Sequence, residues 1–443
     1  MTTAPPSTAV AWRWRGALGV LSAADRSALL DRSMSRDDRV AVRTAEIVAR
    51  VRRDGDVALR ALAEELDGVK LDELEVPRRE WVGALDRLAP GVRRSMQRSA
   101  ANIERVHRAF QPVAQEIESE PGVIVGRRPD PLQRVGVYAP GGRAAYPSSV
   151  LMGVVPARVA GVSDVVVCSP PGRHSGRPSE VVLAAAALAG AHRVFALGGA
   201  GAIAAMAYGT VSVPRVDRIV GPGNAYVAQA KLLVANAVAI DSPAGPSELL
   251  VIADDSADPV LVARELLAQA EHDPLAAVVA VASSERVARA IADSVADQLP
   301  TQPRHAVCTA ALGGQGALLW ADSIDEAIAF ANMYAAEHLL LVVRAPDEAL
   351  VKLRNAGTVF VGASASVAFG DYMTGANHVL PTGGLARSYS GLSTLDFVRW
   401  TTYQRVSRDA AARLADDVGA FADAEGLPGH AAAARAWRDT GAS

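Results

Sequence analysis

Short runs of β-branched residues alternate with Ala-rich amphipathic stretches along most of the chain. Such runs are typical of buried parallel strands, and the amphipathic stretches are typical of helices. The first series of predicted strands covers residues 134–138, 164–168, 193–197 and 217–220. The second covers 248–253, 276–282, 338–343 and 358–361, with helices predicted over 258–271 and 323–334. The alternation predicts two α/β units, each with a parallel sheet.

The two ends of the chain have a different pattern. Residues 22–110 are predicted to be helical, because Val40, Ile47, Val48 and Val51 follow the spacing of one helix face. At the other end, a polar, glycine-spaced stretch leads into a helix-prone tail at 409–442. The tail has too little apolar surface to fold alone, so we expect it to pack on the body or on a neighbouring subunit.

Size and composition exclude several classes of protein. The 443 residues suffice for two or three domains, half of them are hydrophobic, and the net charge of −3 provides no basic field for nucleic acid. The two cysteines, Cys168 and Cys308, are expected to be core thiols in a reducing cytoplasm. Residues 1–6 lack the apolar core of a secretory signal, and His192 and Arg193 interrupt the apolar stretch 181–208, so no membrane span is predicted.

Glycine-containing turns follow or join several of the predicted strands, at 140–142, 198–201, 221–224 and 244–247. Glycine lets backbone N–H groups approach a phosphate closely, and a helix N-terminus adds a favourable dipole, so a dinucleotide would suit this edge. None of the turns is a full G-x-G-x-x-G, and tight turns need glycine for steric reasons alone. A nucleotide site and ordinary turns both remain open.

Gln269 and His272 are three residues apart on a predicted helix, so their side chains share one face. With Asp371 and a further histidine they would supply the nitrogen and oxygen donors that zinc accepts. The alternative is a surface glutamine and a capping histidine near a helix end.

Glu337 and His338 precede the apolar run 339–343, so we expect them at the mouth of a buried strand. Partial burial there would raise a carboxyl pKa and favour neutral imidazole, which suits acid–base chemistry, although adjacent Glu and His are also common by chance. Only Lys231 among the lysines lies near a candidate motif, so imine chemistry has few candidates. The histidines without suitable neighbours are expected to face solvent: His107, His174, His192 and His305.

Taken together and in this order, the segments resemble the histidinol dehydrogenase family. The matching stretches are VGVYAPGG at 135–142, GGAGAI at 198–203, GPGN at 221–224, IDSPAGPSE at 240–248 and QAEHDPL at 269–275. Further on come AEHL at 336–339, GD at 370–371, NHVLPT at 377–382 and EGLPGH at 425–430. The similarity runs from about residue 20 to residue 440.

The resemblance implies a zinc-dependent, NAD-linked, four-electron oxidation of L-histidinol through L-histidinaldehyde to L-histidine, the last step of histidine biosynthesis. It also implies a homodimer, in which His430 reaches across from the partner subunit. Glu337 would activate the water that attacks the aldehyde, and His338 would shuttle protons in both oxidations. The implied zinc ligands are Gln269, His272, Asp371 and His430.

By the same resemblance, the NAD contacts are Tyr138, Gly201 and Asn224. The family commonly has glutamine at position 201, so at Gly201 the backbone or a water must replace that side chain. For Ser247, the structural alternative to substrate contact is a helix-capping hydroxyl. The implied substrate residues are Ser247, Gln269, His272, His338, Asp371, His378, Glu425 and His430.

The resemblance further implies an α/β fold of two incomplete Rossmann-like domains. We expect an N-terminal helical segment at 1–30, a first domain with the metal and catalytic residues at 31–136 and 248–385, a second on the NAD side at 137–247, and a tail exchanged in the dimer at 386–443. Two alternatives stay open. One is a paralogous zinc and NAD alcohol dehydrogenase, such as a sulfopropanediol dehydrogenase, and the other is a zinc hydrolase that uses Glu337 and His338 to activate water.

Overall fold

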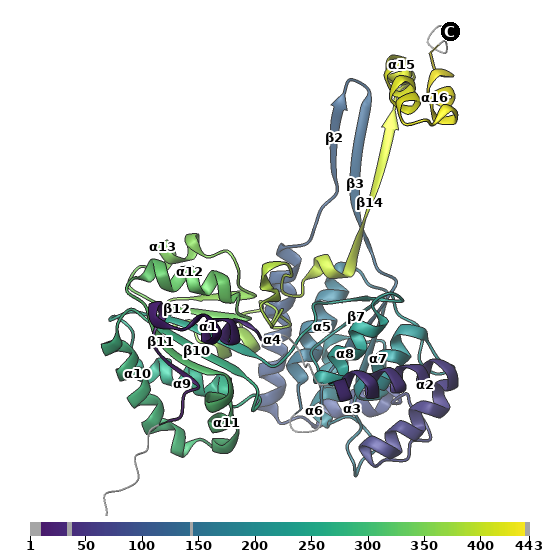
Figure 1. Cartoon of the computed structure of the whole chain (residues 1–443). Helices are drawn as coiled ribbons and strands as arrows, with labels where there is room; N and C mark the ends of the chain where they lie inside the picture. Colours follow the sequence, from purple (N-terminus) through teal and green to yellow (C-terminus); the bar gives the residue numbers. More distant parts are fainter. Residues whose placement is uncertain (1–9, 33–37, 142–144, 439–443) are drawn as a thin grey trace, which may run out of the picture.

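The computed structural model describes residues 10–32, 38–141 and 145–438, so the expectations for residues 1–6 and Gly142 lie outside the described residues. The described chain forms two α/β lobes side by side, and a long arm of strands extends from them and carries helices at its far end (Figure 1). The predicted α/β class is confirmed.

The first lobe contains a parallel sheet with the strand order β1-β11-β10-β9-β12-β13. Its strands are β1 (Trp14–Ala17), β9 (Glu248–Ala253), β10 (Ala277–Ala282), β11 (Gly316–Trp320), β12 (His338–Val342) and β13 (Thr358–Val361). Its helices are α1 (Ala23–Leu30), α9 (Pro259–Ala270), α10 (Glu285–Gln298), α11 (His305–Gln315), α12 (Ile324–Tyr334), α13 (Pro346–Lys352) and α14 (Val367–Tyr372). The central strands are buried along their whole length, as parallel strands covered on both faces are.

The second lobe contains a parallel sheet with the order β6-β5-β4-β7-β8. Its strands are β4 (Arg134–Tyr138), β5 (Asp164–Ser169), β6 (Arg193–Ala196), β7 (Arg218–Val220) and β8 (Ala239–Ile240). Its helices are α2 (Asp38–Leu62), α3 (Arg78–Arg87), α4 (Pro90–Ala109), α5 (Pro147–Ala160), α6 (Glu180–Ala189), α7 (Gly199–Tyr208) and α8 (Ala225–Val234). A π-helical turn, η2 (Ala63–Asp67), continues α2.

Packing divides the chain differently from the expected domain boundaries. β1 pairs with β11, and Trp14 and Leu29 join the core of the first lobe, so the N-terminal segment is part of that domain. Residues of α2 and α4, such as Leu59 and Ile103, instead share one core with Val135 of the second lobe. The assignment of 31–136 to the first domain is therefore wrong. The stretches that carry the resemblance begin at Val135, and the helical pattern before it shows that a helix face is buried but not which sheet covers it.

The arm is an antiparallel sheet of β14 (Val398–Val406), β3 (Val123–Pro131) and β2 (Gln115–Glu120), followed by α15 (Arg408–Ala424) and α16 (Pro428–Arg435). Figure 1 shows these helices at the far end of the arm, away from both lobes. Ile117 and Phe421 are 67% and 71% exposed in the single chain. Apolar side chains presented in this way are typical of a surface that another chain covers.

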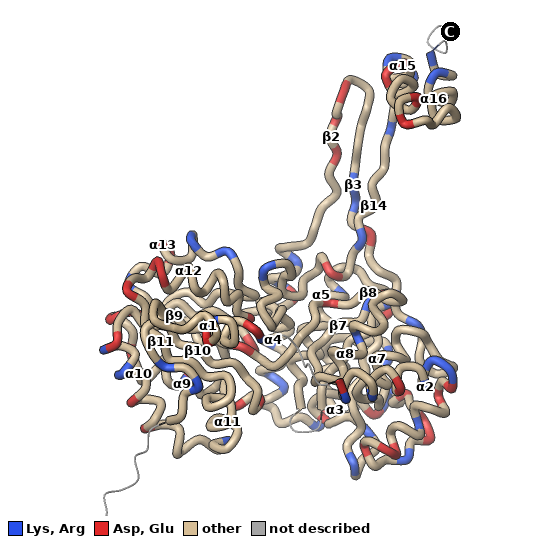
Figure 2. The backbone as a smooth tube through the Cα atoms, in the orientation of Figure 1, with Lys and Arg blue, Asp and Glu red and all other residues tan. Residues whose placement is uncertain are grey.

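The surface charges of both lobes are mixed in sign, with Lys and Arg interspersed among Asp and Glu (Figure 2). Within the described ranges, no helix combines the length and the apolar character needed to cross a bilayer.

One of the links between the lobes joins the carboxyl edge of the second sheet to the amino edge of the first. β8 ends at Ile240 and β9 begins at Glu248, so residues 241–247 run from the carboxyl edge of the second sheet to the amino edge of the first. The Gly245 N–H in this link donates to the hydroxyl of Thr382 at 2.5 Å. The cofactor motifs on one sheet and the catalytic motifs on the other thus lie on either side of one short segment.

Candidate active site

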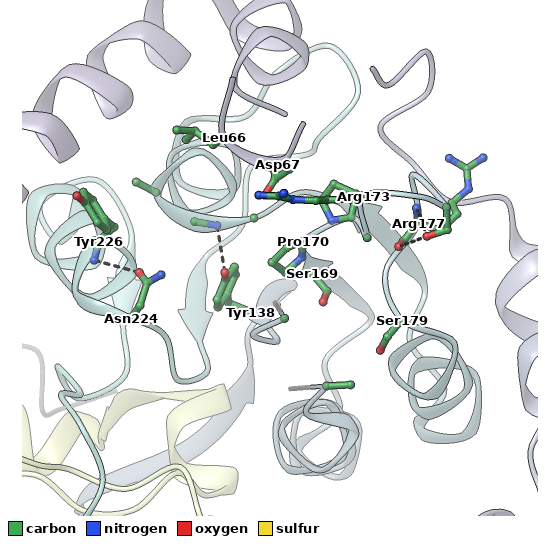
Figure 3. Close-up of a pocket in the computed structure, with 18 of the residues that line it drawn as sticks. Leu66, Asp67, Tyr138, Ser169, Pro170, Arg173, Arg177, Ser179, Asn224 and Tyr226 are labelled. Carbon is green, nitrogen blue, oxygen red and sulfur yellow. Dashed lines mark hydrogen bonds between the residues drawn. The ribbon is translucent and has the colours of Figure 1, made fainter. Parts of the chain in front are cut away.

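A cavity lies at the carboxyl edge of the second sheet. Tyr138 ends β4, Ser169 ends β5, and Asn224 follows β7. These residues, together with Gly198 and Gly199 after β6, line a cavity of about 900 Å³ (Figure 3). The sheet has a switch point here, because β5 lies on one side of β4 and β7 on the other. Open parallel sheets bind ligands at such points, so the glycine turns meet at a candidate nucleotide site.

Helix N-termini line the same cavity. The Gly199 N–H at the start of α7 donates to the phenol oxygen of Tyr138 at 3.0 Å. Asn224 caps α8, since its side-chain oxygen accepts from the N–H groups of Tyr226 and Val227 at 3.1 and 3.2 Å. Burial raises the pKa of Tyr138 to about 12, so its hydroxyl keeps a proton to donate. Donors and helix dipoles at this edge favour an anionic ligand.

A buried ion pair holds the turn that leads to Asn224. Lys231 pairs with Asp241, and its ammonium donates to the Gly221 carbonyl at 2.7 Å. The other carboxylate oxygen of Asp241 accepts from the Gly221 N–H at 2.7 Å. The two side chains are only 2% and 4% exposed. Lys231 therefore fixes a backbone turn, which leaves it unsuited to imine chemistry.

Gly201 lies inside α7 and is not one of the residues that line the cavity. A Cβ atom at this position would meet Leu62 Cδ1 at 3.4 Å and Leu59 Cδ2 at 3.6 Å. The position therefore faces the last turn of α2, and a role for Gly201 in NAD binding stays a prediction.

Charged residues that no sequence motif indicates also line the cavity. Arg43 comes from α2, Asp67 from η2, and Arg173 and Arg177 from the loop after β5. Figure 3 shows Asp67 beside Arg173. Burial raises the pKa of Asp67 to about 6, and the charge of Arg173 acts against this rise. These residues are far apart in the sequence, so no local motif could have found them.

The acid–base pair lies at the amino edge of the first sheet. Glu337 directly precedes β12, His338 is its first residue, and they are only 6% and 4% exposed. The strand register places His338 opposite Leu249 of β9, so Glu337 lies beside Glu248. This is the strand-mouth position that the sequence predicts.

The two ring nitrogens of His338 have different surroundings. Nδ1 lies 3.0 Å from the backbone carbonyl oxygen of Glu248 and 3.4 Å from Oε2 of Glu337. A carbonyl only accepts, so Nδ1 carries a proton and Nε2 is the atom free to exchange one. Nε2 is buried, has no hydrogen-bond partner among the described residues, and lies 3.7 Å from Oδ1 of Asp371.

The expected neutral imidazole is wrong for His338. Burial acts to lower the pKa of His338, but the carboxylates of Glu337 and Asp371 outweigh it and raise the pKa to about 9. The apolar run after this pair indicates that it is buried, but the position of the second carboxylate beside the ring depends on the fold.

Gln269 and Asp371 come from neighbouring helices. The Glu265 carboxylate on α9, one turn before Gln269, accepts from the N–H of Val367 on α14, one turn before Asp371, at 3.0 Å. Gln269 is 3% exposed and its Nε2 has no hydrogen-bond partner in the described part of the chain, so the surface-glutamine alternative is wrong. His272 follows the end of α9, and its N–H donates to the Gln269 carbonyl at 3.3 Å.

No group of three or more His, Cys, Asp and Glu residues in the described ranges is arranged to hold a metal ion. Of the expected zinc ligands in this part of the chain, His272 and Asp371 belong to those residue types, whereas Gln269 does not. A metal site here therefore depends on the glutamine amide and on a donor from elsewhere.

Two further predicted substrate residues lie near the same edge. Nδ1 of His378 lies 2.9 Å from the backbone carbonyl oxygen of Asp371, and burial lowers the pKa of His378. Ser247 precedes β9, and its carbonyl accepts from the Ala277 N–H at 3.0 Å. Because Ser247 introduces a strand, the helix-cap alternative for its hydroxyl is wrong.

Glu425 and His430 lie elsewhere. Glu425 directly follows α15 and His430 lies in α16, and both are exposed at the far end of the arm (Figure 1). Within one chain they are therefore apart from Gln269, His272 and Asp371.

Comparison with known proteins identifies the family that has this arrangement. The family model described as histidinol dehydrogenase matches residues 30–438. The protein named histidinol dehydrogenase in Halobacterium salinarum is 50% identical over 92% of this chain and 95% of its own length. Its counterpart in Methanosarcina barkeri is 45% identical over 94% of this chain and 96% of its own. The chain belongs to the histidinol dehydrogenase family.

A solved structure agrees with membership of the histidinol dehydrogenase family. The crystal structure of histidinol dehydrogenase from Elizabethkingia anophelis matches with a TM-score of 0.91 and 33% identity, over 97% of this chain and 98% of that one. At this coverage, the likeness includes the arm as well as the lobes. Membership makes the protein an oxidoreductase.

The remaining histidines and cysteines of this histidinol dehydrogenase family member are mostly as expected. His174, His192 and His305 are exposed. His107 is not, because it is 4% exposed within α4 and burial lowers its pKa to about 4. Cys168 and Cys308 are both fully buried, which confirms the prediction of core thiols.

Proposed function

We propose that the protein oxidises L-histidinol through L-histidinaldehyde to L-histidine, using zinc and NAD, as the last step of histidine biosynthesis in the cytoplasm. Family membership supports the substrate. The observation that carries the proposal is the environment of His338, whose Nδ1 is held by a backbone carbonyl while its buried Nε2 faces Asp371 without a hydrogen-bond partner among the described residues. Such an imidazole can exchange protons at one defined atom.

The donor set fits zinc. Gln269 contributes a buried amide with an unpartnered end, and a half-turn of that amide presents its oxygen instead of its nitrogen. His272 and Asp371 add an imidazole and a carboxylate, which are donors that zinc accepts. We propose that His430 of the partner subunit completes the set. When bound, zinc supplies a Lewis acid that orients the substrate's nitrogen atoms.

NAD suits the cavity of the second sheet, where it would accept a hydride in each oxidation. Tyr138 and Asn224 line this cavity, and the N-terminus of α7 offers backbone N–H groups to a phosphate. Gly201 has no side chain to contribute, so we expect the backbone at the start of α7 to provide that part of the binding.

The chain's own residues account for the proton transfers. In the first oxidation, the deprotonated form of His338, which its pKa of about 9 makes more abundant as pH rises, would take the hydroxyl proton of the substrate at Nε2. It would return that proton to the aldehyde oxygen as the water adds, and in the second oxidation it would take the hydroxyl proton of the hydrated aldehyde. Glu337 would accept a proton from the water that attacks the aldehyde. Ser247, His378 and Glu425 would contact the substrate, and the carboxylate of Glu425 suits a cationic amine.

We further propose a homodimer with shared active sites, because the arm carries Glu425 and His430 away from their own lobes. Mixed refolding tests this. His338→Asn and His430→Ala should each be inactive alone, yet regain activity when refolded together, since a mixed dimer then contains one intact site. Each variant refolded with itself is the control, and a mixture that stays inactive contradicts the shared site.

A spectrophotometric assay tests the reaction. NADH should form with L-histidinol in a ratio of two per substrate, and a zinc chelator should abolish it. NADH formation with 2,3-dihydroxypropanesulfonate alone would overturn the proposal in favour of the paralogous alcohol dehydrogenase. Turnover without NAD would favour the hydrolase.

A further inference from the structure

Glu248 has no role in the proposed chemistry, yet it is 2% exposed at the first position of β9. Its carboxylate accepts a two-pronged contact from Arg32, with Nε to Oε1 at 2.9 Å and Nη2 to Oε2 at 3.2 Å. It also accepts from the Gly383 N–H at 2.7 Å and from the Glu337 N–H at 3.3 Å. Contacts from separate segments of the chain therefore converge on this carboxylate and fix it.

The backbone of the same residue holds both members of the acid–base pair. The Glu248 N–H donates to Oε2 of Glu337 at 2.8 Å. The Glu248 carbonyl accepts from Nδ1 of His338 at 3.0 Å. A rotation of this one residue would therefore turn the Glu337 carboxylate and the His338 ring together.

Arg32 makes this arrangement electrostatically possible. Glu248 and Glu337 are buried carboxylates at neighbouring positions of adjacent strands, so their charges repel. The side chains of Arg32 and Glu248 are 5% and 3% exposed. The Arg32 guanidinium also donates to the backbone carbonyl of Tyr334 at 2.6 Å and lies 3.4 Å from the centroid of the Tyr334 ring. Arg32 thus supplies the compensating charge from the N-terminal segment, and its own position is fixed by α12.

We propose that the Arg32–Glu248 pair is a positioning device for catalysis, which holds the Glu248 backbone so that Glu337 and His338 keep their orientation toward the substrate. Neither residue of the pair needs to touch the substrate. The inference rests on the proposed function for the identity of the reaction. It adds that the orientation of the acid–base groups is set by an ion pair far away in the sequence.

The test compares Glu248→Gln with the wild type in the L-histidinol assay. The substitution keeps the size of the side chain and removes its charge, which weakens the pair with Arg32. We expect kcat to fall about 10- to 100-fold, because small misplacements of catalytic groups lower the rate by this order. The KM for L-histidinol, the KM for NAD and the zinc content should change little, because the proposal gives Glu248 no contact with the substrate, the cofactor or the metal. Asp164→Asn, which breaks the Arg134–Asp164 pair at the opposite edge of the second sheet, is the matched control and should keep the wild-type kcat.

A mutant cycle separates positioning from general stability. If Glu248 acts through the acid–base pair, Glu248→Gln should cost almost nothing further in a background that carries both Glu337→Gln and His338→Asn, because both groups that it orients are already absent. Losses that multiply would overturn the inference, as would a full kcat in Glu248→Gln. If the single variant does not fold, Arg32→Met with Glu248→Gln removes both charges together and should fold with the same loss of kcat. A wild type that forms no NADH with L-histidinol would overturn the proposed function and this inference with it, whereas an active wild type isolates the inference.

Discussion

Gly221 and Tyr138 approach each other so closely that a Cβ atom on Gly221 would overlap the carbonyl oxygen of Tyr138. Gly221 also has a φ of +113°, which L side chains rarely adopt. Gly221→Ala should therefore cost more than about 1 kcal/mol of stability and displace the turn before Asn224. We expect a lower melting temperature and a raised KM for NAD. Gly91→Ala, in an open part of helix α4, is the control. It should leave the KM for NAD unchanged and should not lower the melting temperature.

The Lys231–Asp241 pair gives a second prediction. Lys231→Met should leave Asp241 buried without its cation, which typically costs about 3 to 5 kcal/mol. Urea unfolding measures the loss. Replacing both residues together, as Lys231→Met with Asp241→Asn, should cost less than Lys231→Met alone, and a larger cost would contradict the role of the ion pair.

Glu337→Gln and His338→Asn should each lower turnover by about 10² to 10⁴-fold, which is the usual contribution of an acid–base group. The fold should survive, since Glu337→Gln preserves the side-chain volume and His338→Asn puts a smaller polar side chain in place of the ring. Turnover with L-histidinol under saturating NAD is the measurement, and circular dichroism checks the fold. Near-normal activity of both variants would refute their roles.

His272→Ala should lose zinc together with activity, because metal binding depends on each donor of a small set. Elemental analysis of the purified protein gives the zinc content. His305→Ala removes an exposed imidazole at the start of α11 and should retain both zinc and activity. Full zinc occupancy in His272→Ala would contradict the ligand assignment.

The buried carboxyl group of Asp67 should make the free energy of unfolding depend on pH. Burial raises its pKa from 3.8 to about 6, so between these values the folded state binds more protons than the unfolded state. Stability from this group therefore falls as pH rises through that window. Asp67→Asn should raise the melting temperature at pH 8 and have little effect at pH 3.5. Asp72→Asn, on an exposed loop, should show no such difference.

The sequence predicts the central strands well because their signal is local. The runs at 248–253 and 358–361 coincide with β9 and β13, since strands of a parallel sheet are apolar almost throughout. It does not predict the arm, because every residue of β2 is exposed and no buried face imposes an alternating pattern. Exposed strands that are stabilised by their neighbours leave little trace in hydropathy.

Part of the candidate site can also be predicted from local motifs, and part cannot. Motifs locate Glu337, His338, Gln269 and Asp371, because each lies in a short recognisable segment. The contact of Arg32 with Glu248 joins positions more than 200 residues apart, and no local sequence pattern at either residue indicates it. The raised pKa of His338 likewise depends on Glu337 beside it and on Asp371 from helix α14. Long-range charge pairing is the part of the site that only the folded chain shows.

Each lobe contains one thiol sealed in its core, Cys168 in the second and Cys308 in the first. Burial raises the pKa of Cys168 to about 12 and also raises that of Cys308, so neither thiol forms the reactive thiolate while its lobe is folded. Alkylation at either cysteine then requires that lobe to open. The chain thus contains a natural reporter for each half of its structure, and peptide mapping after timed labelling would tell which half unfolds first.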